Sequence, residues 1–259
     1  MDIAQIISGF AVGAIVGITG VGGGSLMTPL LVLLFGVAPA TAVGTDLLYA
    51  AITKSGGTFV HARRGNVDWR IVGLLAAGSL PAAALTLFLV SHFAAGGLAG
   101  TSKTITFSLG IALLLTSVAL VFRHRLQLWA QSHDVATLPS YRRSRLTMLT
   151  GATLGILVSL SSVGAGALGV TALFFLYPRL AAIRVVGADL AHAVPLTLVA
   201  GLGHWWLGSV DCTLLGTLLL GSLPGIFVGS HLAHRIPERV LRLALAGMLV
   251  LVGAKLIAV

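Results

Sequence analysis

The sequence predicts an all-α polytopic membrane protein with two inverted-topology repeats, each a re-entrant or broken first helix pair plus three transmembrane helices. Three observations lead to this fold class. Of the 259 residues, 57% are hydrophobic and only 9% are charged, whereas a soluble domain usually carries about 25% charged residues. Apolar runs long enough to cross a bilayer recur along the whole chain. Residue clusters of the first half also recur in the second half at a nearly constant spacing.

The composition argues against several other classes of protein. The net charge is +9, but the lysines and arginines lie mainly in short connections, where they indicate membrane topology rather than a nucleic-acid surface. The single cysteine, Cys212, cannot form a disulfide framework or a dithiol relay. No lysine or arginine precedes the first apolar run, which is unlike a secretory signal peptide. No metal or cofactor site is expected, because the eight histidines are scattered along the chain.

Eight apolar segments are expected to form the helices. They are 3–35, 39–61, 69–92, 103–122, 146–177, 181–206, 211–232 and 239–258. The longest polar interval, 123–145, holds five arginines and a single acidic residue. We therefore divide the chain into a first membrane repeat (1–122), a basic cytoplasmic linker (123–145) and a second membrane repeat (146–259).

The duplication is visible in specific clusters rather than in general composition. Gly9 and Gly13 recur 142 residues later as Gly151 and Gly155, and the small-xxx-small spacing of these glycines predicts close helix packing. Further along each half the spacing becomes 143 residues. The matching clusters are then 43–46 with 186–189, His61 with His204, 65–68 with 208–211, and 78–81 with 221–224.

Charges in the connections set the expected orientation. Short connections rich in lysine and arginine stay in the cytoplasm, so the arginines near 61–70, 123–145 and 233–242 place these three connections inside. The connections 92–102 and 207–211 lack such a basic cluster and are expected outside.

This assignment requires one apolar segment of each half to enter the membrane and return. Between the 123–145 linker and the external 207–211 connection the number of crossings must be odd, yet two apolar segments lie there. Arg179 and Arg184 indicate that 146–177 is the segment that returns to the cytoplasm. Because 3–35 is the repeat counterpart of 146–177, we expect it to enter the membrane from the outside and return there, and we predict that both termini are external. The alternative is an ordinary single span, because 3–19 is nearly long enough to cross by itself.

A glycine-rich tip interrupts each returning segment. Helix breaks at membrane depth are tolerated only in a protein-lined or wet cavity, and a half-helix that begins there directs its N-terminal N–H groups and dipole towards an anion. The glycines let an oxyanion approach the backbone closely, and the hydroxyls add donors. The predicted substrate-binding residues of the tips are Thr19, Gly20, Gly22, Gly23, Gly24, Ser25, Ser161, Ser162, Gly164 and Gly166. A nucleotide-binding P-loop is not supported, because no Gly-Lys-Ser/Thr follows either cluster.

Ionisable residues inside predicted spans are costly and therefore candidates for function. Lys54 is the best candidate for a cation facing the substrate; the alternative is a lysine paired with Asp46 or with another acceptor in the bundle. Asp46 and Asp189 occupy the same repeat position, which favours a capping or pairing role.

Two further residues are candidates for coupling or for structure. His192, three residues after Asp189, could relay a proton, or it could be a satisfied buried histidine. Pro195 can free a backbone carbonyl in the middle of its helix, and its repeat position, Ile52, lacks this feature. His61 and His204, at segment ends, are expected at the membrane interface.

The motifs resemble those of a known family. The stretch 17–24 followed by Pro29, then 42–45, then Gly65-Asn66-Val67-Asp68-Trp69-Arg70, is similar to the TauE/SafE sulfite exporter family of bacterial membrane permeases. The resemblance covers essentially the whole chain and implies transport of sulfite, sulfonates and related sulfur-containing anions across the bacterial inner membrane. The second tip departs from the first, with Ser161, Ser162 and Ala165 in place of Thr19, Gly20 and Gly23, which leaves the substrate open.

These observations together predict a non-enzymatic secondary transporter, more an exporter than an importer, for a small sulfur-containing anion. A proton or a sodium ion could couple transport, and small-residue faces would allow a homodimer. An anion channel is the first alternative. An intramembrane serine protease using Ser161 or Ser162 with His192 or His204 is the second; the sequence lacks the Gly-x-Ser-x-Gly context for it.

Overall fold

The computed structural model describes residues 3–19, 24–93, 102–132, 139–232 and 238–258, and this part of the chain is helical with short connections and no strands. The predicted all-α fold class is confirmed. The helices are α1 (Ile3–Thr19), α2 (Gly24–Leu34), α3 (Pro39–Arg63), α4 (Trp69–Phe93), α6 (Ser102–Ser132), α7 (Ser140–Ser161), α8 (Ala167–Leu176), α9 (Ala182–Trp206), α10 (Cys212–Leu232) and α11 (Glu238–Ala258).

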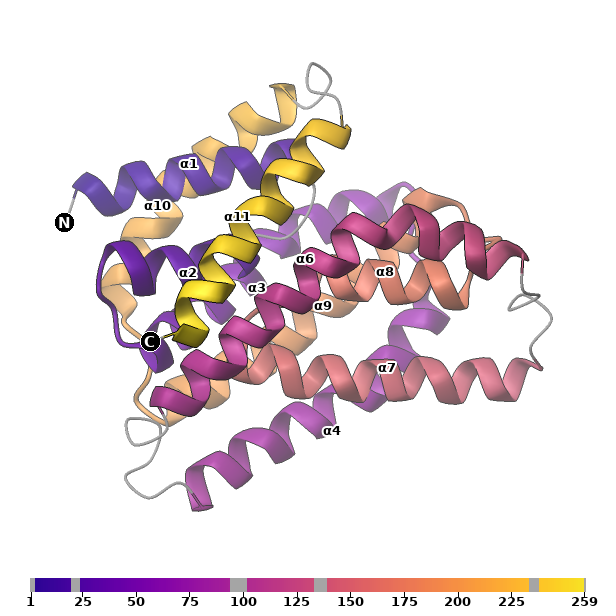
Figure 1. Cartoon of the computed structure of the whole chain (residues 1–259), viewed down its shortest axis with the longest axis horizontal. Helices are drawn as coiled ribbons and strands as arrows, with labels where there is room; N and C mark the ends of the chain where they lie inside the picture. Colours follow the sequence, from indigo (N-terminus) through magenta and orange to yellow (C-terminus); the bar gives the residue numbers. More distant parts are fainter. Residues whose placement is uncertain (1–2, 20–23, 94–101, 133–138, 233–237, 259) are drawn as a thin grey trace.

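Both returning segments are broken into two helices. Residues 146–177 form the end of α7 and all of α8, and the chain turns back between them. The hydroxyl of Tyr177, just after α8, lies 2.9 Å from the hydroxyl of Thr147 in the second turn of α7. Residues 3–35 form α1 and α2, and in Figure 1 α1 runs inward from the N-terminus while α2 runs back towards the same side. Neither segment is one straight helix. That each enters the membrane and returns stays a prediction, because α7 alone is long enough to cross.

The basic linker is mostly helix rather than an open connection. α6 continues to Ser132, and α7 begins at Ser140, so residues 123–132 and 140–145 extend the neighbouring helices. The stretch 123–132 contains no glycine or proline and is rich in arginine, leucine and glutamine, which favour helix. The charge in this region is thus carried by helix ends that project beyond the apolar segments.

The first helix of each half packs on a helix of the other half. α1 packs along α10, and α7 packs along α4. A Cβ atom on Gly9 would lie 2.6 Å from the Leu218 carbonyl oxygen, and one on Gly151 would lie 2.2 Å from that of Leu75. Gly13 and Gly155 approach the carbonyl oxygens of Ser222 and Ser79 in the same way, at 2.4 Å in both cases. The predicted close packing of these glycines is confirmed, and the contacts are exchanged between the halves at equivalent positions.

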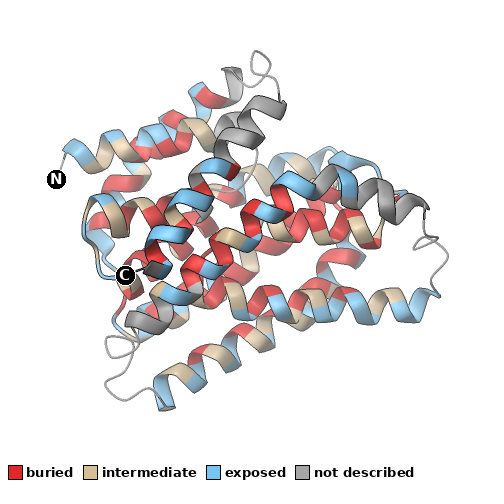
Figure 2. Cartoon of the chain, in the orientation of Figure 1, coloured by how far each residue is buried: buried red, intermediate tan, exposed pale blue. Residues whose placement is uncertain are grey.

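α3 and α9 cross antiparallel at the centre. Gly44 of α3 meets Ser209 and His204 near the end of α9, while Gly187 of α9 meets Asn66 and His61 near the end of α3. Buried residues gather along these central helices and α8, as Figure 2 shows. The small residues at the crossing let the two backbones approach closely.

The outward faces carry large apolar side chains. Phe88 is 60% exposed, Leu149 63%, Phe227 67% and Leu251 74%, and so much exposed apolar surface is expected where a protein meets lipid. Four helices among the described residues are long and apolar enough to cross a membrane, namely Trp69–His92, Ser140–Ser161, Ala182–Trp206 and Cys212–Gly229. The fold is that of a membrane protein with several apolar helices.

The molecule has two chemically different ends. One end, which we call the basic end, carries Arg63, Arg64, Arg70, Arg143, Arg179 and Arg184 on the α3–α4 connection, the start of α7 and the α8–α9 connection. There Arg184 forms an ion pair with Asp68 at 3.4 Å, which joins the two halves. Both termini lie at the other end, to the left in Figure 1.

Candidate functional site

The second tip, between α7 and α8, contains three residues with positive φ. Ser162 caps α7 in the left-handed conformation with φ 57°, and Gly164 and Gly166 have φ values of 121° and 129°. A side chain at either glycine would be strained in that region. Residues 161–165 are all buried, so the irregular backbone is enclosed by protein, as membrane depth requires.

The two serines of this tip have different surroundings. Ser161 Oγ donates to the Leu157 carbonyl at 2.6 Å and accepts from the Val163 amide at 3.2 Å, so its hydroxyl holds the turn together. The Ser162 hydroxyl is buried without a hydrogen bond of normal geometry, yet it lies close enough to interact with the Asp46 carboxylate. Of the two predicted donors, Ser162 is the better placed for a ligand.

Lys54 links the first half to this tip. It lies in the middle of α3, is only 6% exposed, and its ammonium donates to the Ala165 carbonyl oxygen at 2.9 Å. Ala165 stands between the two positive-φ glycines of the tip. Lys54 is therefore paired with an acceptor inside the helix bundle, which was the alternative to a free cation facing the substrate. This acceptor, however, is part of the predicted tip. An ammonium has three donors, so this bond does not use up its capacity.

Two carboxylates surround the same lysine. Asp46 accepts a 2.5 Å hydrogen bond from Thr28 Oγ1 of α2. Asp189 lies against α8, because a Cβ on Gly169 would be 1.9 Å from its Oδ1. Both carboxylates lie near enough to the Lys54 ammonium to interact with its charge. Each aspartate thus contacts the short helix that follows the tip of its own half.

His192 is completely buried one turn from Asp189. Its Nε2 lies 2.8 Å from Ser79 Oγ on α4, and its ring is near enough to Lys54 to interact with its charge. Pro195 follows in the next turn of α9, which remains a continuous helix from Ala182 to Trp206. The structure therefore brings Lys54, Asp46, Asp189, His192 and Ser162 together.

The residues of the first tip are only partly described. Gly20, Gly22 and Gly23 lie outside the described residues. Thr19 is the last residue of α1, Gly24 is the first of α2, and Ser25 follows it. That this tip faces the second one stays a prediction.

Sequence reasoning missed three polar partners in the site and the burial of one histidine. Thr28, Ser79 and the Ala165 carbonyl were not singled out. Ser79 lies in the repeated 78–81 cluster, which is a signal that could have indicated it. That His204 lies at the depth of the membrane interface stays a prediction; within the protein it is 1% exposed, and its Nε2 lies 2.9 Å from the Ser159 carbonyl oxygen. The close α3–α9 crossing encloses it.

A metal centre has no set of ligands in the part of the chain that the structure describes. No three histidine, cysteine, aspartate or glutamate side chains there are arranged so that they could hold a metal ion. The arrangement around the second tip instead offers one cation, hydroxyls and the N-terminus of α8, which suit a small anion.

Comparisons with known proteins agree on a membrane transporter. The profile of the family described as "Sulfite exporter TauE/SafE" matches residues 5–256. The chain is 38% identical to "Probable membrane transporter protein YjnA" of Bacillus subtilis (strain 168), over 99% of this chain and 100% of that protein. It is 29% identical to "Probable membrane transporter protein YdhB" of the same organism, over 93% and 97%.

The similarity extends to an archaeal protein. "Probable membrane transporter protein MJ0441" of Methanocaldococcus jannaschii is 26% identical, over 96% of this chain and 92% of that protein. No solved structure is significantly similar to the chain. In these three matches the similarity covers more than nine-tenths of this chain and of each relative.

Proposed function

The chain belongs to the sulfite exporter TauE/SafE family, and we propose that it is a secondary transporter that exports small sulfur-containing anions such as sulfite or organosulfonates. The observation that carries this proposal is the contact between Lys54 and the second tip. A buried cation of one half donates to the tip backbone of the other half at 2.9 Å. A substrate bound there would touch both halves at once, which alternating access requires.

Three groups favour an anion at this position. The Lys54 ammonium supplies a full charge, the N-terminus of α8 supplies a partial one, and the Ser162 hydroxyl supplies a donor. In the substrate-bound state the anion competes with the Ala165 carbonyl for the ammonium, while the positive-φ glycines leave the backbone accessible.

The two carboxylates suggest the coupling ion. An anion placed beside Asp46 and Asp189 would be repelled if both were ionised, because the single positive charge of Lys54 cannot balance two carboxylates. A proton on the other carboxylate removes this repulsion. We therefore favour a proton over sodium as the coupling ion, with His192 as a further proton-accepting group next to the cluster.

The exchanged packing supports a rocking motion. α1 packs against α10 and α7 packs against α4, so we expect each tip hairpin to move together with a helix of the opposite half. We propose that the halves are inverted repeats, 1–122 and 146–259, joined by 123–145. By the positive-inside tendency the basic end faces the cytoplasm of a bacterial inner membrane, and both termini lie outside.

The alternatives receive less support. An anion channel needs no movement of the tips, whereas the Lys54 contact closes one half against the tip of the other. For the serine protease, Ser161 is committed to its own turn, and the Nε2 atoms of His192 and His204 lie at Ser79 and at the Ser159 carbonyl. Neither histidine Nε2 is placed to activate Ser161 or Ser162.

The test is flux in proteoliposomes. Purified protein should release loaded sulfite along an imposed pH gradient, with saturation and with counterflow of sulfite outside the vesicle. Lys54→Met should lower the flux at least about tenfold, the cost of losing one charge-assisted hydrogen bond. The matched control is Lys255→Met, an exposed lysine of α11. Equal flux in both variants would refute the site, and rapid non-saturating flux without counterflow would establish a channel.

A thermal-shift series identifies the anion. Sulfite, sulfate, thiosulfate and small sulfonates should be compared at equal ionic strength, because a ligand that binds the folded state raises the Tm. The substrate is expected to raise the Tm of the wild type and not that of Lys54→Met. A shift that sulfate and chloride produce equally would count against a specific site.

A further inference from the structure

We propose that the basic end holds a second anion site, distinct from the tip, that binds a free tetrahedral oxyanion. The site is a cavity between the start of α7 and the α8–α9 connection. It does not depend on the proposed transport function, because the residues that line it are not among those proposed for the tip site.

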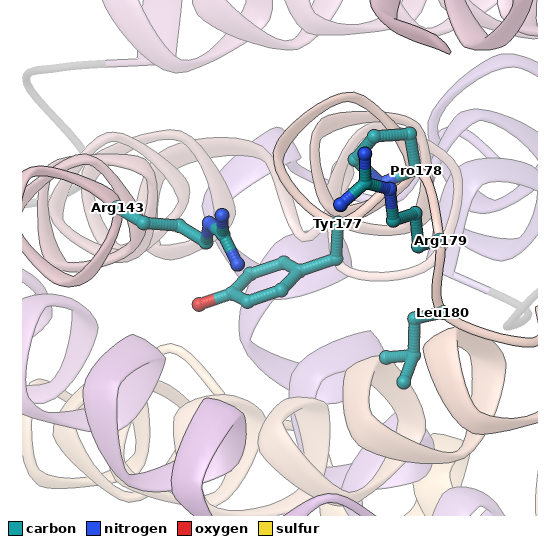
Figure 3. Close-up of a pocket in the computed structure, with 5 residues that line it drawn as sticks. All are labelled: Arg143, Tyr177, Pro178, Arg179 and Leu180. Atoms are coloured by element: carbon teal, nitrogen blue, oxygen red, sulfur yellow. The ribbon is translucent and has the colours of Figure 1, made fainter. Parts of the chain in front are cut away.

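The cavity has two adjoining parts that share a wall. One part, of about 240 Å³, is lined by Arg143, Tyr177, Pro178, Arg179 and Leu180. The other, of about 150 Å³, reaches Asp68 and Arg70 on the first half, and Arg143, Tyr177 and Leu180 line it too. Figure 3 shows the Arg143 guanidinium beside the Tyr177 ring, with Arg179 across the ring from it.

Arg143 is held in place rather than free to move with solvent. Its guanidinium lies 5.6 Å from the centre of the Tyr177 ring. The Tyr177 hydroxyl lies 2.9 Å from Thr147 Oγ1, and Thr147 Oγ1 in turn donates to the Arg143 carbonyl oxygen at 2.8 Å. The single Thr147 proton is used in the second bond, so Tyr177 donates in the first. A guanidinium fixed in this way loses little side-chain entropy on binding a ligand.

The charge around the cavity is positive. Arg70, Arg143 and Arg179 line it against one carboxylate, Asp68, which is paired with Arg184 at 3.4 Å. Guanidinium groups bind the planar pair of oxygens of a sulfate, sulfonate or phosphate group through two parallel hydrogen bonds. Pro178, Leu180 and the Tyr177 ring form an apolar wall beside these groups, which would accept a short carbon chain on the anion.

The two side chains at the centre of the site, Arg143 and Tyr177, are not repeated in the first half. Before the tip the repeat spacing is 142, so Arg143 corresponds to Met1; after the tip it is 143, so Tyr177 corresponds to Leu34. These positions of the first half have neither the hydroxyl nor the guanidinium. If both halves had this pair of side chains, the need to pack two similar units would explain it. The pair is confined to the end that the charge pattern predicts to be cytoplasmic, where an exported anion would first meet the protein.

The experiment measures protection of single arginines from phenylglyoxal, with modified peptides identified by mass spectrometry. The full chain is placed in nanodiscs of phosphatidylcholine, and sodium sulfate is compared with sodium chloride at equal ionic strength. Sulfate should slow modification of Arg143 at least about fivefold and leave Arg145, an exposed arginine two residues along α7, within twofold. Because no arginine lies at the tip, failure of the tip site would not alter this result.

Variants and a lipid arm complete the test. Arg143→Gln should weaken sulfate binding, measured by protection of Arg179, at least about tenfold, whereas Arg143→Lys should retain part of it and Arg145→Gln all of it. Should Arg143→Gln fail to fold, the wild-type protection pattern still decides. Equal protection of Arg143 and Arg145, or none, overturns the proposal. Protection that appears only when phosphatidylglycerol is added also overturns it, because the occupant is then a lipid headgroup.

Discussion

The two halves of the molecule share their packing and differ in their chemistry. Gly13 meets Ser222 in one exchanged contact, and Gly155 meets Ser79 in the equivalent one. Asp46 and Asp189 also occupy equivalent positions. At the centre, however, Lys54 corresponds to Thr197, whose hydroxyl donates to the Ala193 carbonyl of its own helix at 2.8 Å. His192 likewise corresponds to Tyr49, and Pro195 to Ile52.

This difference separates architecture from function. Contacts present in both halves are explained by the need to pack two similar units against each other. A buried lysine present in one half alone has no such explanation, and burying it is costly. The four predictions below use the comparison between duplicated and single features, beginning with the largest expected effect.

The duplicated glycine contacts should be indispensable in both halves. A Cβ on Gly78 would lie 1.9 Å from the Met148 carbonyl oxygen, and one on Gly221 would lie 2.0 Å from that of Ile6. Backbone atoms cannot yield, so Gly78→Val and Gly221→Val should each abolish the monodisperse folded protein in size-exclusion chromatography. Gly73→Ala and Gly216→Ala, on the same two helices, meet nothing within 4 Å and serve as controls. If Gly78→Val folded and Gly221→Val did not, the two glycine contacts would not be equivalent in the two halves.

Replacing Lys54 by threonine, the residue at the equivalent position of the second half, should greatly reduce transport. Lys54→Thr gives the first half the residue that the second half carries, and flux should fall at least about tenfold because the charge at the tip is lost. Thr197→Val removes only a hydroxyl that bonds within α9 and should keep flux within about twofold. Both are measured in proteoliposomes with equal protein content. A similar loss in both variants would mean that the two positions share one structural role.

Neutralising a carboxylate should uncouple transport without stopping it. Asp189→Asn keeps the shape of the side chain but cannot exchange a proton, so uptake driven by a pH gradient should fall at least about fivefold while anion counterflow persists. Asp46→Asn should behave alike, because both carboxylates act on Lys54. The control is Asp211→Asn, an exposed residue that accepts from the Thr213 and Leu214 amides at 2.9 Å. Full pH-driven accumulation in both central variants would refute proton coupling through them.

The ion pair between Asp68 and Arg184 should matter least. It joins the halves at the basic end, but the side chains are 26% and 46% exposed and 3.4 Å apart. Exposed pairs of this kind contribute about 0.2–1 kcal/mol. A double-mutant cycle with Asp68→Asn and Arg184→Gln, read as Tm and as flux, should give a coupling in that range and flux within twofold. A coupling above about 2 kcal/mol would indicate that the pair locks the two halves.

Much of the fold could be predicted because it follows from local rules. The glycine spacing of 9–13 and 151–155 predicts close packing wherever these helices meet a neighbour. The breaks near the glycine clusters follow from the arginines on both sides of 146–177. The helical extension of α6 to Ser132 was missed, because polar residues were read as a connection although their helix propensity is high.

The sequence predicted which residues belong to the candidate site, but not which atoms they contact. Lys54 and Ser162 were both expected at the site, yet no sequence rule assigns a different role to the adjacent Ser161, whose hydroxyl closes its own turn. The partner of Asp46, Thr28, is separated from it by a turn and part of a helix, so its distance depends on how α2 lies on α3. Such distances are set by packing.

By itself, the sequence determined that this chain is a helical membrane protein, where its helices break and which end is basic, because hydropathy, glycine and charge act over a few residues. Only the tertiary structure decided that α1 lies on α10 and α7 on α4, and that Lys54 of one half meets Ala165 of the other. These contacts join residues far apart in the chain, and their geometry depends on backbone approaches that no local pattern encodes.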